Sequence, residues 1–319
     1  QRFPEIQVLS GREGLVRLAN LPELDVLVSA IPGTLPLQAT LEALHQGCRV
    51  ALANKETLVA AGGLIRKALA SGTGQILPVD SEQSAIFQCL EGHPAHSVHR
   101  VVLTASGGPF RDPAVDLQRM TPAQALHHPT WKMGTKITID SASLMNKGLE
   151  LIETARLFPF LREEQIDVVV HPQSLVHSLV EFHDGSILAQ LGPVNMEIPI
   201  QYALTWPERL DPPQRLDLTS CGPLNFLALD EERFPSVALA RKALRGGDEG
   251  GAVFQAANEV AVEAFLEHRI PFTGIFGLVG KALETVNGTP VDGCDAVELI
   301  MARTRKLCRE WIVEGKVNG

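Results

Sequence analysis

The stretch RVALANKETLVAAGGLIRKALASGTGQILPVD (residues 49–80) decides the fold class, because it reads as a strand, a helix and a strand joined by short links. The apolar runs 49–53 and 75–79 have the length of strands, and the segment between them has a helical pattern. Upstream, a β-like run at 25–31 and a helical pattern at 34–47 repeat the same order. Strands that alternate with helices at this spacing form right-handed crossovers and a parallel sheet. The sequence therefore predicts an α/β fold.

The middle of the chain has a different pattern, since several strand-like runs surround a single helix. The helix is predicted at 144–158, and the strands are predicted at 100–104, 167–171, 176–182 and 186–190. Asp184 and Gly185 form a turn signal between the last two strands and indicate a hairpin. We therefore expect a central α+β catalytic domain. From about residue 235 the pattern is helical to the end, with interruptions at 246–251 and 288–290, which predicts a C-terminal helical domain.

These patterns divide the chain into four expected parts. They are a parallel-sheet domain at 1–79, the catalytic domain at 80–206, a linker at 207–232 and the helical domain at 233–319. The linker holds four prolines and little periodicity. The catalytic domain contains a long segment, 106–134, that is rich in glycine and proline. A connection of that length is more often a functional lid than an inert loop.

The bulk composition excludes several classes of partner. The 319 residues carry 37 acidic and 28 basic side chains, a net charge of −9, which argues against nucleic acid or an anionic membrane as the main partner. Five cysteines without a C-x-x-C pair indicate a reduced, intracellular protein. We see no apolar run of membrane-spanning length and no signal-peptide pattern, so a cytoplasmic location is expected. The chain begins with glutamine rather than methionine, so its start is not taken as the start of the gene product.

Three carboxylates are candidate metal ligands. Asp80 and Glu82 follow the apolar run 75–79, and parallel sheets gather functional groups beyond the carboxyl ends of their strands. Glu150 lies on the predicted central helix and is a hard oxygen donor suited to a divalent cation. Each residue alone has a plainer explanation, because acidic turns are common and a helical glutamate is usually solvated. The prediction rests on their combination.

A phosphate-binding group is predicted next to Glu150. Ser141, Asn146 and Lys147 supply the hydroxyl, amide and ammonium donors that a phosphate monoester needs. Lys147 alone would more often be an ordinary exposed lysine. Ser106, followed by two glycines after a strand, is either a plain turn or a close backbone approach to a phosphate. The pattern indicates a metal-dependent enzyme that acts on a phosphorylated small molecule.

The roles of the histidines and the presence of a nucleotide site are less clearly predicted from the motifs. His128, Trp131 and Met133 lie in the long segment 106–134, where the last two could form an apolar cover over a substrate or an ordinary minor core. His171 and His177 could bind metal, although hydrogen bonding to the metal ligands or to substrate is favoured because three carboxylates are available. The sequence contains no G-x-G-x-x-G, so motifs alone do not support a nucleotide site.

Several segments together resemble one family, 1-deoxy-D-xylulose 5-phosphate reductoisomerase. The segments are ALANKETLVAAGG (51–63), LPVDSEQSAIFQCL (77–90), LTASGGPFRD (103–112), HPTWKMG (128–134), IDSASLMNKGLELIE (139–153), HPQSLVHSLV (171–180), DGSILAQLG (184–192) and AANEVAVEAFL (256–266). The resemblance covers essentially the whole chain. It implies conversion of 1-deoxy-D-xylulose 5-phosphate to 2-C-methyl-D-erythritol 4-phosphate, in non-mevalonate isoprenoid synthesis, with NADPH and Mg²⁺, Mn²⁺ or Co²⁺. It also implies a homodimer in a bacterial cytoplasm, with a plastid left open.

The resemblance assigns roles to matching positions in this sequence. It implies metal binding by Asp80, Glu82 and Glu150, and substrate binding by Ser81, Ser106, His128, Trp131, Met133, Ser141, Asn146, Lys147 and Glu150. It implies cofactor contacts from Asn54, Lys55, Glu56 and Met133, and catalytic roles for Lys55, Glu82, His128 and His177.

The chain also departs from the family. About 70 N-terminal residues of a typical member are absent, including a GSTGSIG-type loop, so residues 1–79 are expected to form only a partial Rossmann-like NADPH-binding domain. Gln83 stands where many members carry histidine. The alternatives are a truncated, non-catalytic homologue that binds metal and phosphosugar or only dimerises, and another metal-dependent phosphosugar enzyme on the same scaffold.

Overall fold

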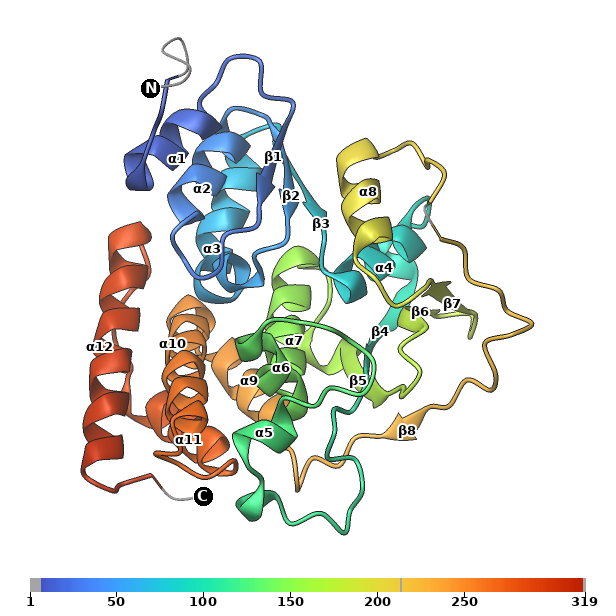
Figure 1. Cartoon of the computed structure of the whole chain (residues 1–319). Coiled ribbons are helices and arrows are strands. Elements are labelled where there is room, and N and C mark those ends of the chain that lie inside the picture. Colours follow the sequence, from blue (N-terminus) through green and yellow to red (C-terminus); the bar gives the residue numbers. More distant parts are fainter. Residues whose placement is uncertain (1–6, 213, 318–319) are drawn as a thin grey trace.

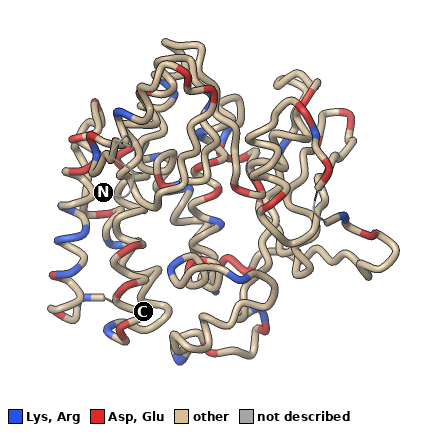
Figure 2. The backbone as a smooth tube through the Cα atoms, turned by 45° about the horizontal axis from the view of Figure 1, so that its top comes forward, with Lys and Arg blue, Asp and Glu red and all other residues tan. Residues whose placement is uncertain are grey.

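A computed structural model of the chain describes residues 7–212 and 214–317 (Figure 1). The ends of the expected first and last domains, 1–6 and 318–319, and residue 213 of the expected linker lie outside the described residues. The larger of two hydrophobic clusters extends from Ala19 to Cys308 and joins the N-terminal, central and C-terminal regions, and a smaller one holds Ala51, Leu77, Val79 and Ala203. Acidic and basic residues are interspersed along the described backbone (Figure 2).

The N-terminal region forms the predicted parallel sheet, in the order β1-β2-β3. Its elements are α1 (Gly11–Ala19), β1 (Val26–Ser29), α2 (Leu37–His45), β2 (Arg49–Leu52), α3 (Lys55–Ser71) and β3 (Gln75–Pro78). Helix α2 begins three residues later than predicted. A residue that precedes a proline disfavours helical geometry, so Leu35 stays outside the helix. Helix α2 therefore begins at Leu37, directly after Pro36.

The central region is a mixed five-stranded sheet in the order β7-β6-β4-β5-β8. Its strands are β4 (Val98–Ala105), β5 (Ile166–Val170), β6 (Val176–Phe182), β7 (Ile187–Leu191) and β8 (Leu227–Ala228). Strands β6 and β7 form the predicted hairpin, and β8 comes from the segment expected to be a linker. The helices here are α4 (Ser81–Leu90), α5 (Pro122–Ala125), α6 (Thr135–Ala142), α7 (Met145–Leu157) and α8 (Glu197–Thr205), with 3-10 turns at Ala95–Ser97, Leu117–Arg119 and Glu163–Gln165.

The long segment 106–134 is divided between core and cavity. Phe110, Leu117 and Ala125 are buried in the hydrophobic core, so much of the segment is fixed. Its last residues, including Trp131 and Met133, line the candidate site instead. The part of the segment able to act as a cover is therefore the stretch just before α6.

The C-terminal region is helical, as predicted, and comprises α9 (Ser236–Arg245), α10 (Gly247–Leu266), α11 (Gly274–Thr285) and α12 (Cys294–Val313). Helix α10 packs against α12, α11, α9 and α3 (Figure 1). The interruption predicted at 246–251 exists but is shorter than predicted: α9 ends at Arg245 and α10 begins at Gly247, so Gly250 and Gly251 lie inside α10. A Cβ atom on Gly251 would lie 1.9 Å from the carbonyl oxygen of Val59 in α3, so this glycine permits close helix packing.

Candidate active site

The first acidic segment begins α4 directly after the parallel sheet. Strand β3 ends at Pro78, and Asp80 is the N-cap of α4, where its Oδ1 atom accepts a hydrogen bond from the Ser81 backbone N–H at 3.0 Å. Glu82 lies in the first turn, and its Oε2 atom accepts a hydrogen bond from the Ser81 hydroxyl at 2.7 Å. A helix start holds Asp80 and Glu82 at the edge of the sheet.

The second segment forms a corner between α6 and α7. Leu144 has the left-handed backbone angle φ = 57° and separates the two helices. Ser141 lies on α6, while Asn146 and Glu150 are one turn apart on α7 and share a face. Glu150 is only 1% exposed, so the expectation of a solvated helical glutamate does not hold at this position.

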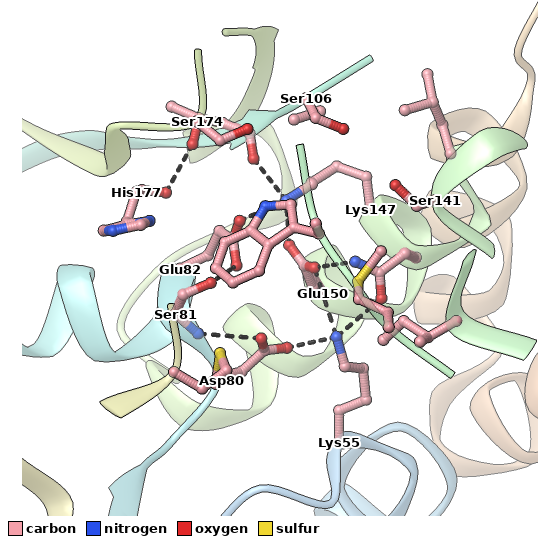
Figure 3. A pocket seen from close by; sticks show the side chains of 18 of the residues that line it. Lys55, Asp80, Ser81, Glu82, Ser106, Ser141, Lys147, Glu150, Ser174 and His177 are labelled. Carbon is pink, nitrogen blue, oxygen red and sulfur yellow. Dashed lines mark hydrogen bonds and ion pairs between the residues drawn. The ribbon is translucent and has the colours of Figure 1, made fainter. Parts of the chain in front are cut away.

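The fold brings the two segments together. Asp80, Glu82 and Glu150 each offer a carboxylate oxygen, and these three atoms lie within 4.8 Å of one another. Figure 3 shows the carboxylates pointing toward one another, with Lys55 on one side and Lys147 on the other. Oxygen-only donors at this spacing have the chemistry that Mg²⁺ or Mn²⁺ prefers.

Two buried lysines lie against the carboxylates. The Lys55 ammonium contacts Asp80, Glu150 at 3.4 Å and the Asn146 side-chain oxygen at 2.9 Å. The Lys147 ammonium contacts Glu150, lies 3.2 Å from Glu82 and donates to the Thr104 carbonyl at 2.6 Å. Burial lowers the pKa of both lysines, but the surrounding carboxylates outweigh it and raise each pKa above its usual value. Both lysines are therefore cationic at neutral pH.

Glu82 and Glu150 differ in how far neighbouring groups stabilise their negative charge. Burial raises the pKa of Glu82, but Lys147 and the Ser81 hydrogen bond outweigh it, so the pKa is lowered. Burial raises the pKa of Glu150 to about 7, and the negative charge of Glu82 adds to the rise. The positive charges of the two lysines therefore do not fully offset the burial of Glu150 and the negative charge of Glu82 at neutral pH. A divalent cation would supply that charge, so the residues present fit a metal site.

His128 joins the two serines of the predicted phosphate group. Its Nε2 atom lies 3.0 Å from the hydroxyl oxygens of both Ser106 and Ser141. The backbone N–H of Trp131 donates to Nδ1 at 2.9 Å, and that of Thr130 at 3.2 Å. Burial, with a contribution from Arg111, lowers the pKa of His128. Because Nδ1 accepts, the neutral ring carries its proton on Nε2, which donates toward the serine oxygens.

A cavity of about 270 Å³ connects these groups. Its lining contains twelve of the residues predicted from the sequence: Lys55, Asp80, Ser81, Glu82, Ser106, Trp131, Met133, Ser141, Asn146, Lys147, Glu150 and His177. Burial lowers the pKa of His177 although Glu82 opposes the shift, so this imidazole is neutral at pH 7. Asp80, Glu82 and Glu150 form the acidic floor of the cavity. Ser106 and Ser141 form its hydroxyl-rich end, and Trp131 and Met133 form its apolar cover.

Four candidate residues lie outside the cavity lining. The ring of His171 is held by the backbone, since its Nδ1 lies 2.8 Å from the Asn225 carbonyl oxygen and its Nε2 accepts a hydrogen bond from the Leu175 N–H at 3.1 Å. His128 stands behind the two serines, as described above.

Asn54 is the N-cap of α3, and its amide donates to the carbonyls of Ile31 at 2.5 Å and Gly33 at 2.8 Å, which fixes the loop after β1. Glu56 accepts a hydrogen bond from the same amide at 3.1 Å. Asn54 and Glu56 therefore act on the position of the loop and of α3.

The structure adds lining residues that sequence reasoning missed. Thr104, Lys132, Ser174 and Met196 line the cavity. Thr104 contributes its backbone carbonyl to Lys147, a contact with no side-chain signature. Ser174 has φ = 54°, and its position after the HPQ triplet is a signal that could have been used. Gln83, the departure from the family pattern, is buried and donates to the Glu150 carbonyl and the Thr154 hydroxyl, both at 3.1 Å, which ties α4 to α7.

Comparisons with known proteins agree with this geometry. The family model for 1-deoxy-D-xylulose 5-phosphate reductoisomerase matches residues 1–62, the model for its C-terminal domain matches residues 76–158, and a second model, described as DXP reductoisomerase C-terminal domain, matches residues 191–307. The reductoisomerase of Heliobacterium modesticaldum is 51% identical over 318 residues, which cover 99% of this chain and 81% of the relative. This chain belongs to the 1-deoxy-D-xylulose 5-phosphate reductoisomerase family. The family predicted from the motifs is therefore confirmed.

Other relatives give the same result. The reductoisomerase of Pseudomonas putida (strain W619) is 50% identical over 313 residues, 96% of this chain and 79% of that protein. The Zymomonas mobilis reductoisomerase in complex with NADPH superposes with a TM-score of 0.89 at 43% identity, covering 95% of this chain and 78% of that chain. A reductoisomerase in complex with NADPH, fosmidomycin and magnesium gives a TM-score of 0.90 at 42% identity, covering 98% and 81%. These solved relatives confirm the predicted fold class. Within the described residues, every helix is too short or too polar to cross a bilayer.

Proposed function

We propose that this chain converts 1-deoxy-D-xylulose 5-phosphate to 2-C-methyl-D-erythritol 4-phosphate with NADPH, and that Asp80, Glu82 and Glu150 hold the divalent cation. The observation that carries the proposal is the meeting of three carboxylate oxygens within 4.8 Å at the floor of the cavity. A cation bound there stabilises negative charge on substrate oxygens while the carbon skeleton rearranges. Ser81, beside two of these ligands, donates to the substrate backbone.

The part of the cavity next to the acidic floor, toward Ser106 and Ser141, is proposed to bind the substrate phosphate. Ser106, Ser141, Asn146 and Lys147 supply its donors, and Lys147 also lies against Glu82 and Glu150. Because His128 donates from Nε2 toward the serine oxygens, the serine hydroxyl protons are free to point at the phosphate. A fixed phosphate orients a small, flexible substrate over the metal ligands.

The remaining residues are proposed to act around the reacting carbons. Lys55 reaches the acidic floor from α3, so its ammonium can stabilise negative charge where substrate and NADPH meet. Met133 lines the cavity and is proposed to contact the cofactor, while Asn54 and Glu56 are proposed to act on cofactor binding through the loop after β1. The neutral His177 offers a hydrogen bond to substrate. Trp131 covers the site and excludes water from the intermediate.

Substrate-dependent oxidation of NADPH tests the function directly. We expect the 319-residue chain to oxidise NADPH with 1-deoxy-D-xylulose 5-phosphate and Mg²⁺ or Mn²⁺, and to lose this activity in excess chelator. The product should be identified as 2-C-methyl-D-erythritol 4-phosphate. A folded sample that binds metal and substrate without turnover would instead favour the non-catalytic homologue.

We also propose a homodimer formed through the central region, in a bacterial cytoplasm. Strand β7 is the edge of the five-stranded sheet, and its Ile187 and Leu188 are 54% and 40% exposed. An unpaired edge with exposed apolar side chains is suited to pairing with a second copy. Sedimentation equilibrium should give twice the chain mass, and a monomer at micromolar concentration would contradict the proposal. Fractionation of the source cells with an activity assay checks the location.

The proposed domain roles follow from where the lining residues lie. Residues 1–79 supply Ala53 and Lys55 to the cavity, and residues 80–206 supply the remaining lining. The linker 207–232 and the helical domain 233–319 contribute none of the residues that line this cavity. The helical domain must therefore affect the site, if at all, through contacts behind it.

A further inference from the structure

Helix α10 carries the segment AANEVAVEAFL, for which the metal, phosphate and cofactor assignments give no role. Asn258 in this segment is fully buried. Its side-chain nitrogen donates to the Oδ1 atom of Asp140 in α6 at 2.7 Å. This hydrogen bond connects the C-terminal helical region to the helix that carries Ser141.

Asp140 is held on both of its oxygens. While Asn258 donates to Oδ1, the Lys136 ammonium lies 2.6 Å from Oδ2. Asp140 is 2% exposed, so it depends on these two partners in place of water. Lys136 is one turn earlier on the same helix, which makes Asn258 the partner that fixes α6 to another element. A hydrogen bond to a buried carboxylate is among the stronger kinds.

Helix α6 determines where part of the site lies. Ile137 and Ser141 of this helix line the cavity, and the cover residues Trp131 and Met133 come just before its start. Ser141 is the residue after Asp140, and its hydroxyl lies 3.0 Å from Nε2 of His128. A shift or rotation of α6 would therefore move Ser141 relative to His128 and Ser106.

We propose that Asn258 is a positioning residue, which through Asp140 holds α6 so that Ser141 stays in place to bind the substrate phosphate. This inference rests on the proposed phosphate role of Ser141. It gives the C-terminal helical region a function in substrate binding, although this region contributes none of the residues that line the cavity.

The Asn258→Asp variant tests the proposal, because it is isosteric and places a carboxylate against Asp140. We expect KM for 1-deoxy-D-xylulose 5-phosphate to rise about tenfold, the effect of losing one hydrogen bond to a charged group. KM for NADPH should not change, and kcat should fall less than KM rises. If this variant does not fold, Asn258→Ala removes the donor without adding a charge and should raise the same KM.

Gln255→Glu is the matched control. Gln255 is also buried in α10, one turn earlier, and its side-chain nitrogen donates to Glu259 at 2.9 Å. Its conversion to glutamate also places two carboxylates side by side, but Glu259 forms its ion pair with Arg305 of α12 and makes no hydrogen bond to Asp140. We expect this variant to lower Tm as Asn258→Asp does, while KM for the substrate stays at the wild-type value. Equal KM changes in both variants would mean that Asn258 serves only general stability.

A double variant in which the amide and the carboxylate are exchanged tests whether the substrate KM can be restored. In Asp140→Asn/Asn258→Asp the amide and the carboxylate trade places, so one hydrogen bond between α6 and α10 is restored. We expect KM to return to within about threefold of wild type, since most of the lost interaction is regained. No rescue in a folded double variant would overturn the proposal.

The Ser141→Ala variant distinguishes a failure of the positioning role of Asn258 from a failure of the phosphate role of Ser141. A raised KM in Ser141→Ala with a wild-type KM in Asn258→Asp would reject the positioning role alone. An unchanged KM in Ser141→Ala would reject the phosphate role on which the positioning role rests.

Discussion

Asp80→Asn is expected to lower kcat/KM by about 10³-fold at limiting Mg²⁺, since loss of a metal ligand removes several kcal/mol of charge stabilisation. The substitution should keep the start of α4, while Lys55 loses one of its two carboxylate partners and keeps Glu150. Asparagine is as good an N-cap as aspartate, so the hydrogen bond from the Ser81 N–H is kept. Steady-state rates over a Mg²⁺ titration give the measurement, and part of the loss should return at high Mg²⁺.

Asp116→Asn is the control for this change. Asp116 is also an N-cap, before Leu117–Arg119, but its side chain is exposed and it lies outside the cavity lining. Its variant should have the wild-type rate and the wild-type Mg²⁺ dependence. A near-normal rate of Asp80→Asn at limiting Mg²⁺ would show that Asp80 is not a metal ligand.

Lys147→Met is expected to raise KM for 1-deoxy-D-xylulose 5-phosphate by about 10²-fold, the effect of losing a charge-assisted hydrogen bond to the phosphate. It should also destabilise the protein in the presence of a chelator, by about 3 to 5 kcal/mol, because Glu82 and Glu150 lose a buried cation. Mg²⁺ supplies positive charge to the same carboxylates. The rise in Tm on adding Mg²⁺ should therefore be larger in this variant than in the wild type.

Lys242→Met makes the same substitution on α9, where the lysine is partly exposed and pairs with the exposed Glu284 at 2.8 Å. An exposed ion pair contributes at most about 1 kcal/mol, so KM and the Mg²⁺ effect should match those of the wild type. An unchanged substrate KM in Lys147→Met would count against its phosphate role. Enzyme kinetics and thermal denaturation with and without Mg²⁺ provide both readouts.

The parallel sheet was predictable because its signal is local. Apolar runs such as 49–53 and 75–79 have strand length, and the short links between strands and helices leave few topologies. Helices α4 and α6 were not predicted, since α4 begins and α6 ends at a site motif whose polar residues interrupt the apolar periodicity. The predicted break at 246–251 was too long, because Gly251 belongs to α10, where it allows the helix to approach Val59, a residue distant in the sequence.

The sequence by itself determined the types of chemical group: Asp80, Glu82 and Glu150 as hard oxygen donors, and Ser141, Asn146 and Lys147 as phosphate donors. Composition and motif identity are properties of the residues themselves, so they can be read without a fold. Only the tertiary structure decided that the three carboxylates meet, because residues 80 and 150 are joined by packing between α4 and α7.

The tertiary structure alone also determined the protonation of these groups. The pKa of Glu150 rises to about 7 because the residue is buried beside Glu82, and the proton of His128 lies on Nε2 because the Trp131 backbone donates to Nδ1. The Asn258–Asp140 hydrogen bond likewise joins residues that no local pattern relates. Electrostatic environment and long-range hydrogen bonding depend on distances in space, and these exist only once the chain has folded.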